Sequence, residues 1–401
     1  MGKLNQLYLR LDTLTIFRNL LEDPVISAFQ DFAGFFSLEG DDGRDSPFTE
    51  EKIGAYSHFV SELYKDSSSL TEYVKKAVLS DENFYIVGRG KDLFFDQVVK
   101  NALESDLEVL EDLATLTSRE VKAEIPCPVS LPDWVTEDMD LKEIYRNRID
   151  HLKQEGYGIF SNYFAFVFQD DHLEPIVHTD TVLLGDLPGY DDERNQVIQN
   201  TLALIEDMPS NNVLLYGDTG TGKTTTIRAV VNTYHPRGLR CIEVSNDQLV
   251  NLSKLMDLIT DNPLKFIVFI DDLTISASDA GLSTLKSVLD GSMSYKGKNM
   301  AIYATSSSAD MVRNVALSPE DAQRAEEESR ALTSRFGIVV TFQPPEREDY
   351  LQVVYHLADK MGLFISREEL AAKAEEYAKE HGERSPRTAR HFIRLQSYLY
   401  D

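Results

Sequence analysis

A phosphate-binding pattern lies near the middle of the chain, where residues 217–224 read Gly-Asp-Thr-Gly-Thr-Gly-Lys-Thr. Glycines let a loop curl so that successive backbone N–H groups face a phosphate, and the following helix adds its positive N-terminal end. Lys223 is placed to reach the β- and γ-phosphates of a nucleotide, and the Thr224 hydroxyl to hold Mg²⁺. The alternative is a Gly-rich turn with an accidental lysine, which the apolar run before the motif and the helical pattern after it disfavour.

Two acids follow the next strongly apolar run, Phe266–Ile270, at Asp271 and Asp272. A buried strand that ends in a carboxylate brings an acid beside a magnesium ion. We therefore expect Asp271 to act on the water shell of the metal and Asp272 to polarise the attacking water. The alternative is an ordinary strand with an acidic turn, but the pair follows Lys223 by one α/β unit, as a nucleotide site requires.

Two weaker signals come later in the chain. The run Met300–Ala304 ends in the hydroxyl residues 305–307, which could orient a water or sense a γ-phosphate, although such residues also occur in plain turns. Arg335 precedes the apolar run Ile338–Phe342, and an isolated arginine in such a place is more often a partner in a surface ion pair.

Arg387 lies where a cation is unfavourable. Ser385 and Pro386 form a good N-cap and first helical position, so Arg387 falls in the first turn and opposes the helix dipole. Residues 387, 390 and 394 share one helix face and form a positive stripe. We expect an anionic group to lie opposite this stripe.

The elements that position these residues differ between the two parts of the chain. Residues 1–155 are predicted to be mainly helical, as in Leu107–Leu116, where apolar residues recur at intervals of three and four. Residues 156–183 are expected to connect the two parts with short strands, including a strand-like run over Ile159–Phe168. Exposed or broken segments are predicted at Gly40–Pro47 and from Pro126 to Asp133.

Residues 184–345 are predicted to form an α/β core with a parallel sheet of five strands covered on both faces, and 346–401 a helical lid. The five predicted strands are Asn212–Tyr216, Arg240–Val244, Phe266–Ile270, Met300–Ala304 and Ile338–Phe342.

In their order these motifs resemble those of the AAA+ ATPases. From about Leu184 to the C-terminus the chain is similar to the bacterial family of AAA+ ATPases known as domain of unknown function 815. The stretches that carry the resemblance are Leu187–Arg194, Asn211–Thr224, Pro236–Arg240, Ile302–Ser306, Ser334–Gly337 and Arg387–Phe392. The stretch before Ile338 is also similar to that of branch-migration helicase motors.

The resemblance implies specific roles. Gly189 and Tyr190 would hold the adenine, Arg335 would be an arginine finger for a neighbouring subunit, and Arg387 a second sensor on the lid. The implied nucleotide-binding residues are Gly189, Tyr190, Gly217, Asp218, Thr219, Gly220, Thr221, Gly222, Lys223, Thr224, Thr225 and Arg387. The implied catalytic residues are Lys223, Asp271, Asp272, Ser307 and Arg335, and Thr224 and Asp271 would hold the metal.

Two positions depart from the AAA+ pattern. Asp272 stands where a glutamate is usual and is one methylene shorter, and Ser307 stands where the family typically has asparagine at the strand end. The first departure puts efficient hydrolysis in question. The second puts in question whether Ser307 is the first sensor, the strand-end residue that orients a water or senses the γ-phosphate.

Charge and cysteine content limit the function classes. The chain has 40 Lys and Arg against 67 Asp and Glu, a net charge of −27, and residues 1–180 alone carry −18. Such a charge disfavours nucleic-acid binding, because it repels phosphate backbones. The N-terminus lacks a signal-peptide layout, apolar runs are too short for a membrane span, and Cys127 and Cys241 lie far apart, so we expect a cytoplasmic protein.

The sequence thus predicts an oligomeric, Mg²⁺-dependent ATPase that binds ATP and remodels a protein partner through the acidic N-terminal domain. Two alternatives stay open. One is a DNA-acting motor or helicase loader, supported by the similarity around Arg335. The other is a nucleotide-gated switch of low turnover, supported by Asp272.

Overall fold

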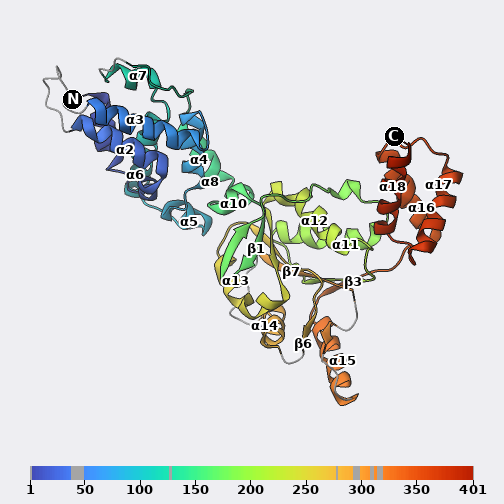
Figure 1. Cartoon of the computed structure of the whole chain (residues 1–401). Helices are drawn as coiled ribbons and strands as arrows, with labels where there is room; N and C mark the ends of the chain where they lie inside the picture. The colour runs from blue at the N-terminus through green and yellow to red at the C-terminus, as the bar shows by residue number, and fades with distance from the viewer. Residues whose placement is uncertain are drawn as a thin grey trace. The chain divides into compact units, whose positions relative to one another are not determined.

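The structure, a computed structural model, describes residues 2–37, 49–125, 129–276, 279–291, 299–307, 311–313 and 319–400. It divides into two compact units, Met1–Asn162 and Tyr163–Asp401 (Figure 1). The predicted loop Gly40–Pro47 and the start of the predicted break at Pro126 lie outside the described residues. In the described part of the chain, no helix is both long and apolar enough to cross a lipid bilayer.

The first unit is helical, as predicted. Its α-helices are α1 (Lys3–Leu11), α2 (Pro24–Ser37), α3 (Thr49–Tyr64), α4 (Leu70–Ser80), α5 (Phe84–Gly90), α6 (Gln97–Ala114), α7 (Ser118–Ala123), α8 (Leu141–Asp150), α9 (Leu152–Glu155) and α10 (Ile159–Asn162), with a 3-10 helix at Arg18–Glu22. Helix α10 corrects one prediction. The strand-like run at Ile159–Phe168 begins as a helix, and its strand starts only at Ala165.

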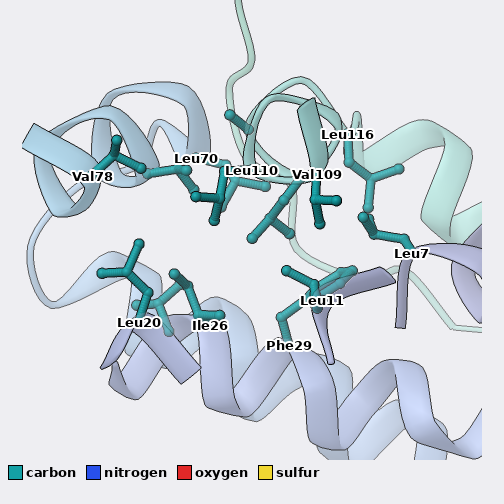
Figure 2. Packing of buried hydrophobic residues seen from close by; sticks show 14 of the residues in the cluster. Leu7, Leu11, Leu20, Ile26, Phe29, Leu70, Val78, Val109, Leu110 and Leu116 are labelled. Carbon is teal, nitrogen blue, oxygen red and sulfur yellow. The ribbon is translucent and has the colours of Figure 1, made fainter. Parts of the chain in front are cut away.

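One apolar core holds the first unit together. In Figure 2, side chains of α1 and α2 face side chains of α4 and α6, and the labelled residues of these helices are Leu7, Leu11, Ile26, Phe29, Leu70, Val78, Val109 and Leu110. The helix predicted from Leu107–Leu116 is confirmed within α6, whose residues 107, 110 and 113 are all buried. Burial of side chains at this helical spacing stabilises the helix, since its propensity alone would be marginal.

A buried carboxylate ties α6 to the end of α1. Asp106 accepts hydrogen bonds from the backbone N–H groups of Thr15, Ile16 and Phe17, at 2.8, 2.7 and 3.2 Å. These three donors lie where the chain leaves α1, and they have no helical acceptor there. Since a buried N–H without a partner is costly, Asp106 fixes the path of the chain into the core.

The second unit is built on a mostly parallel sheet. Its strands are β1 (Ala165–Gln169), β2 (His172–Pro175), β3 (Val213–Gly217), β4 (Leu239–Val244), β5 (Lys265–Ile270), β7 (Met300–Ser306) and β9 (Ile338–Phe342). Their order is β2-β1-β4-β5-β7-β3-β9, and all neighbours are parallel except β1 and β2.

The five predicted strands are therefore confirmed, but the sheet has seven strands rather than five. The two additional strands come from residues 156–183, for which short strands were predicted in a connecting segment but not as members of this sheet. Strand β1 pairs with β4, with Ala165 opposite Cys241, and β2 folds back on β1.

Helices cover the sheet as predicted. Helices α11 (Asp191–Ile205) and α12 (Lys223–Tyr234) pack on one face through Val197, Leu204, Ile227 and Val230. Figure 1 shows α13 and α14 on the other side of the sheet. The remaining elements before the C-terminal helices are α13 (Leu252–Ile259), α14 (Ala280–Leu289), α15 (Pro319–Thr333), the 3-10 helices Leu184–Asp186, His235–Arg237 and Asn246–Asn251, and a second small sheet of β6 (Ile275–Ser276) and β8 (Val312–Arg313).

Three C-terminal helices form a bundle with an apolar core of its own. They are α16 (Arg347–Lys360), α17 (Arg367–Glu380) and α18 (Pro386–Tyr400). Helix α17 is capped at its N-terminal end, where the Ser366 hydroxyl accepts a hydrogen bond from the backbone N–H of Glu369 at 3.2 Å. Beyond the end of α17, Gly382 has φ +81°, a left-handed conformation that glycine adopts without strain.

Candidate functional site

A cavity of about 500 Å³ lies where β3, β5 and β7 end, and helices α12, α16 and α18 contribute to its wall. In an open α/β sheet the carboxyl ends of the strands are the usual place for a ligand. The residues predicted from the sequence that line it are Tyr190, Thr219, Gly220, Thr221, Gly222, Lys223, Thr224, Thr225, Asp271, Asp272, Ser307 and Arg387. Gly189, Gly217 and Asp218 are their neighbours in the chain.

The loop between β3 and α12 depends on two glycines. Gly217 ends β3 with φ +135°, and a Cβ there would lie 2.0 Å from the Phe342 carbonyl oxygen. Gly222, with φ +102°, directly precedes α12. A side chain would clash at the first position and strain the backbone at the second. The loop thus curls as the phosphate-binding pattern predicts, and it turns the N-terminal end of α12 toward the cavity.

Lys223, the first residue of α12, is held inside this loop. Its ammonium group donates to the carbonyl oxygens of Gly217 and Asp218, at 2.6 and 2.7 Å. Burial lowers the pKa of Lys223, and the negative charges of Asp218, Asp272 and Asp271 partly oppose that shift. The lysine thus places a desolvated cation at the mouth of the loop, and it has acceptors that it could exchange for phosphate oxygens.

The two residues predicted to hold a metal lie together. The Thr224 hydroxyl donates to Asp271 Oδ1 at 2.7 Å, and the Thr305 hydroxyl donates to the same oxygen at 2.6 Å. Both aspartates follow β5, whereas Thr305 belongs to the neighbouring strand β7. One carboxylate oxygen is therefore fixed between hydroxyl groups from a helix and a strand.

Asp272 adopts a left-handed backbone conformation with φ +49°, which aspartate tolerates better than most residues. Its N–H donates to Thr305 Oγ1 at 2.8 Å, and its Oδ1 accepts from the Ser307 hydroxyl at 3.0 Å. The predicted Ser307 thus contacts Asp272, but Thr305 contacts both aspartates. Thr305 therefore holds the Asp271 carboxylate and the Asp272 backbone, whereas Ser307 holds the Asp272 carboxylate.

Tyr190 closes another side of the cavity. It directly precedes α11 in a left-handed conformation, its hydroxyl donates to the Gln343 carbonyl at 2.7 Å, and its ring lies 5.1 Å from that of Phe342. Burial raises the pKa of Tyr190 to about 12, so the hydroxyl stays a donor at neutral pH. A Cβ on Gly189 would lie 3.7 Å from Val353 of α16, so this segment lies next to the C-terminal bundle.

The positive stripe of α18 faces the same cavity. Arg387, Arg390 and Arg394 all line it, as their shared helix face predicted. The Ser385 hydroxyl caps the helix by accepting from the Thr388 N–H at 3.1 Å, and the backbone N–H of Arg387 donates to the Gly220 carbonyl at 3.3 Å. Helix α18 is therefore hydrogen-bonded to the phosphate-binding loop itself.

Arg335 lies elsewhere in the unit. Its Nε is 2.9 Å from Asp290 Oδ1, and its Nη1 donates to the Ala331 carbonyl at 2.6 Å. It lines a separate hollow, together with Asn211, Gly291 and Ile302. Within one chain Arg335 is thus the ion-pair partner that the alternative interpretation described, and a role as arginine finger stays a prediction.

Several other residues that line the cavity were not predicted to belong to the site. Arg194 of α11 and the apolar Val353 and Leu357 of α16 are the main ones. Their periodic spacing is that of ordinary amphipathic helices, so nothing in the local pattern separates them from core or surface residues.

The family described as "Protein of unknown function (DUF815)" matches residues 161–397, which is more than half of the chain. Comparison with curated proteins gave no match.

Among solved structures, the chain is similar to the Thermotoga maritima RuvB Holliday junction branch migration motor, with 14% identity, a TM-score of 0.39 and coverage of 54% of this chain and 63% of that one. Two mutant forms of the same motor match with 17% and 18% identity and TM-scores of 0.38 and 0.39; each covers 54% of this chain and 63% or 65% of the mutant chain. The chain thus spans less than two thirds of the length of these relatives.

Proposed function

Since the chain belongs to the family described as protein of unknown function (DUF815), which the sequence relates to AAA+ ATPases, we propose that it binds ATP with Mg²⁺ and hydrolyses it to ADP and phosphate. One observation carries the proposal. A single cavity is lined by the Lys223 ammonium, by Thr224 beside Asp271, and by the Arg387 face of α18. Phosphoryl transfer needs a cation on the β- and γ-oxygens, oxygen ligands for a metal, and a group that positions water.

The donor set fits magnesium. Mg²⁺ takes oxygen ligands and is usually bound through one or two protein oxygens and substrate phosphates. The Thr224 hydroxyl and the Asp271 carboxylate, 2.7 Å apart, are such donors and would hold the ion. An ion held there would supply positive charge to offset the negative charge that develops on the phosphate oxygens.

The chain's own groups would act as follows. Lys223 exchanges the carbonyl oxygens of its loop for β- and γ-phosphate oxygens, and Arg387 adds positive charge from α18. Asp272 orients the attacking water and accepts its proton, with its carboxylate held by the Ser307 hydroxyl at 3.0 Å. Tyr190 and Gly189 lie beside the base.

Two variants test this proposal against the wild-type protein. Lys223→Ala should lose most ATP affinity in calorimetry. Asp272→Asn should bind ATP normally and release little phosphate, because asparagine keeps the backbone conformation of Asp272 and loses the charge. If the folded wild-type protein did not bind ATP at millimolar concentration in the presence of Mg²⁺, the proposal would be wrong.

A nucleotide-gated switch is the second candidate, and Asp272 is the observation that favours it. Its carboxylate is one methylene shorter than that of glutamate, and the Ser307 hydroxyl already occupies one of its oxygens. Turnover measured beside binding separates the two functions. Tight ATP binding with almost no phosphate release would favour the switch, and Asp272→Glu would then be expected to raise turnover.

We also propose that the active form is an oligomer in which Arg335 acts on the site of a neighbouring subunit. The Asp290 ion pair would have to open for this. Arg335→Ala should then bind ATP normally but hydrolyse it poorly, and turnover per subunit of the wild type should rise with protein concentration. Mixing Arg335→Ala with Lys223→Ala should restore some activity. The Arg335→Ala subunit keeps an intact phosphate-binding loop, and its Lys223→Ala neighbour can supply the missing arginine.

A matched control for this test is Arg330→Ala. Arg330 lies in α15 close to Arg335 in sequence and forms an ion pair with Glu326 within that helix. It should have wild-type turnover. Full activity of Arg335→Ala, at any protein concentration, would contradict the role in a neighbouring site.

For the partner, we propose a protein client in the cytoplasm that docks on the acidic helical domain, residues 1–155. Residues 156–183 would connect this domain to the α/β core, 184–345, and residues 346–401 would form a lid. The support is the charge of −18 over residues 1–180. Affinity capture with Asp272→Asn would identify the client, and tight, salt-sensitive DNA binding by the full chain would favour the DNA-acting alternative.

A further inference from the structure

Arg194 is a buried cation in the wall of the cavity. It lies in the first turns of α11, its side chain is 7% exposed, and it lines the same cavity as Lys223. Its Nη2 is 3.5 Å from Asp191 Oδ1, but no described residue accepts a hydrogen bond from this nitrogen. Because Asp191 itself is 93% exposed, water weakens the attraction between the two charges.

A buried, charged Arg194 lowers the stability of the folded protein. A buried charge without its full set of hydrogen bonds is unfavourable, and burial lowers the pKa of Arg194, although a guanidinium remains protonated at any physiological pH. An apolar side chain of similar length would avoid this cost. A ligand that supplied an acceptor in the cavity would offset it.

The position of Arg194 defines which part of a ligand it meets. Its backbone N–H donates to the Tyr190 carbonyl at 2.9 Å, so the two residues lie one helical turn apart. The cavity residues nearest to them in the chain are Leu187 and Pro188, and α16 adds Val353 and Leu357. This apolar part of the wall suits a flat base, whereas the cations and hydroxyls of the β3–α12 loop suit phosphates.

We propose that the Arg194 guanidinium binds the base of the nucleotide, donating a hydrogen bond to a ring nitrogen of adenine. The inference rests on the proposed function and adds to it the residue that recognises the nucleoside. A guanidinium only donates, and adenine offers acceptors at N1, N3 and N7. Arg194 thus contributes to binding through the base, while Lys223 and α18 contribute through the phosphates.

Arg194→Met tests this assignment, because it keeps length and apolar packing and removes the donors. Calorimetry on the full chain would compare ATP with inorganic tripolyphosphate, which has the phosphates and no base. We expect ATP affinity to fall about 10- to 100-fold, as for the loss of a hydrogen bond to a charged group. Tripolyphosphate affinity should stay within about two-fold of wild type.

Two further variants and a set of analogues sharpen the result. Arg194→Lys keeps a donor and should recover part of the affinity, and Arg237→Met, which removes an exposed arginine paired with Glu206, should bind both ligands like wild type. In a set of ATP analogues, each has one adenine ring nitrogen replaced by C–H. Only the analogue that lacks the nitrogen bound by Arg194 should bind wild type more weakly than ATP does. The affinity of that analogue should be the same for Arg194→Met as for wild type.

Equal loss of ATP and tripolyphosphate affinity in Arg194→Met would overturn the inference, since the arginine would then act on the phosphates. Unchanged ATP affinity would overturn it as well. A wild-type protein that binds tripolyphosphate but not ATP would refute the base contact and leave the phosphate site intact. Failure to bind either ligand would instead refute the proposed function.

Discussion

We expect substitution of Thr305 to impair both the stability of the protein and its ATP turnover, while the phosphate-binding loop stays intact. Thr305 lies near the end of β7, is 2% exposed, and is not one of the catalytic residues that the sequence singled out. Its hydroxyl donates to Asp271 Oδ1 at 2.6 Å and accepts from the Asp272 N–H at 2.8 Å. One oxygen atom therefore positions the carboxylate of Asp271 and the backbone of Asp272.

Thr305→Val removes that oxygen with almost no change in shape, and valine suits a strand. The Asp272 N–H then loses its acceptor, which costs about 1 kcal/mol, and Asp271 loses a charge-assisted hydrogen bond, typically worth about 1.5–3 kcal/mol. Because Asp271 is exposed, water replaces part of the second loss. The free energy of unfolding should therefore fall by about 2 kcal/mol. Thr305→Ser, which keeps the hydroxyl, should lose less than half of that.

Urea unfolding and phosphate release would be measured on the same preparations. We expect Thr305→Val to reduce Mg²⁺-dependent turnover at least ~10-fold, because a displaced carboxylate weakens general-base and metal contacts. Its affinity for tripolyphosphate without Mg²⁺ should not change, since the loop is intact. Wild-type stability and turnover in Thr305→Val, or a Thr305→Ser protein as impaired as the valine variant, would refute the reasoning.

Three further predictions concern other residues. Lys223→Ala removes a cation that would bind phosphate oxygens, so the affinity for tripolyphosphate in calorimetry should fall at least ~10-fold. The circular dichroism spectrum should stay unchanged. An affinity equal to that of wild type would contradict the assignment. Asp106→Ala leaves three N–H groups without their acceptor and should lower the free energy of unfolding of the first unit by about 3–5 kcal/mol in urea; a loss below about 1 kcal/mol would show that water replaces the carboxylate. Burial, with the charge of Arg240, lowers the pKa of His235, whose ring stacks on Phe164 at 4.2 Å. The unfolded chain then binds a proton more readily than the folded one, so stability is full above about pH 6.5 and falls on acidification. The thermal midpoint of His235→Phe should fall less than that of wild type between pH 7.5 and 5.5, and identical shifts would contradict this.

Much of the second unit could be predicted because its signals are local. The strand Ile338–Phe342 was predicted with the limits that it has, and Arg240–Val244 with an error of one residue, since apolar runs between breaks define strands directly. Short strands were predicted within residues 156–183, but their place in the main sheet was not, because β-pairing is not local. Nothing in the residues from Ala165 onward indicates that they pair with Cys241, and that pairing depends on how the whole unit folds.

The candidate site divides in the same way. The loop around Lys223 could be predicted in full, because the chemistry of a phosphate fixes a contiguous set of residue types. Arg387 could be predicted because its charge opposes the helix dipole, which a local argument reveals. The role of Arg194 could not be predicted. Its burial depends on how α11 packs on the sheet, and the cavity that it lines is completed by α16, which comes much later in the chain.

The cavity gathers positive charge on an acidic protein. On a chain of net charge −27, the cations Arg194, Lys223, Arg387, Arg390 and Arg394 line one volume of about 500 Å³. They repel one another, and the charge of Arg387 is among the causes that lower the pKa of Lys223. Asp186, Asp271 and Asp272 line the same cavity and offset part of this repulsion. A polyanion that binds there should raise the thermal midpoint by mass action and by relieving the rest of the repulsion. This excess stabilisation should shrink in high salt, and a triphosphate effect that is independent of salt would mean that the repulsion is already screened.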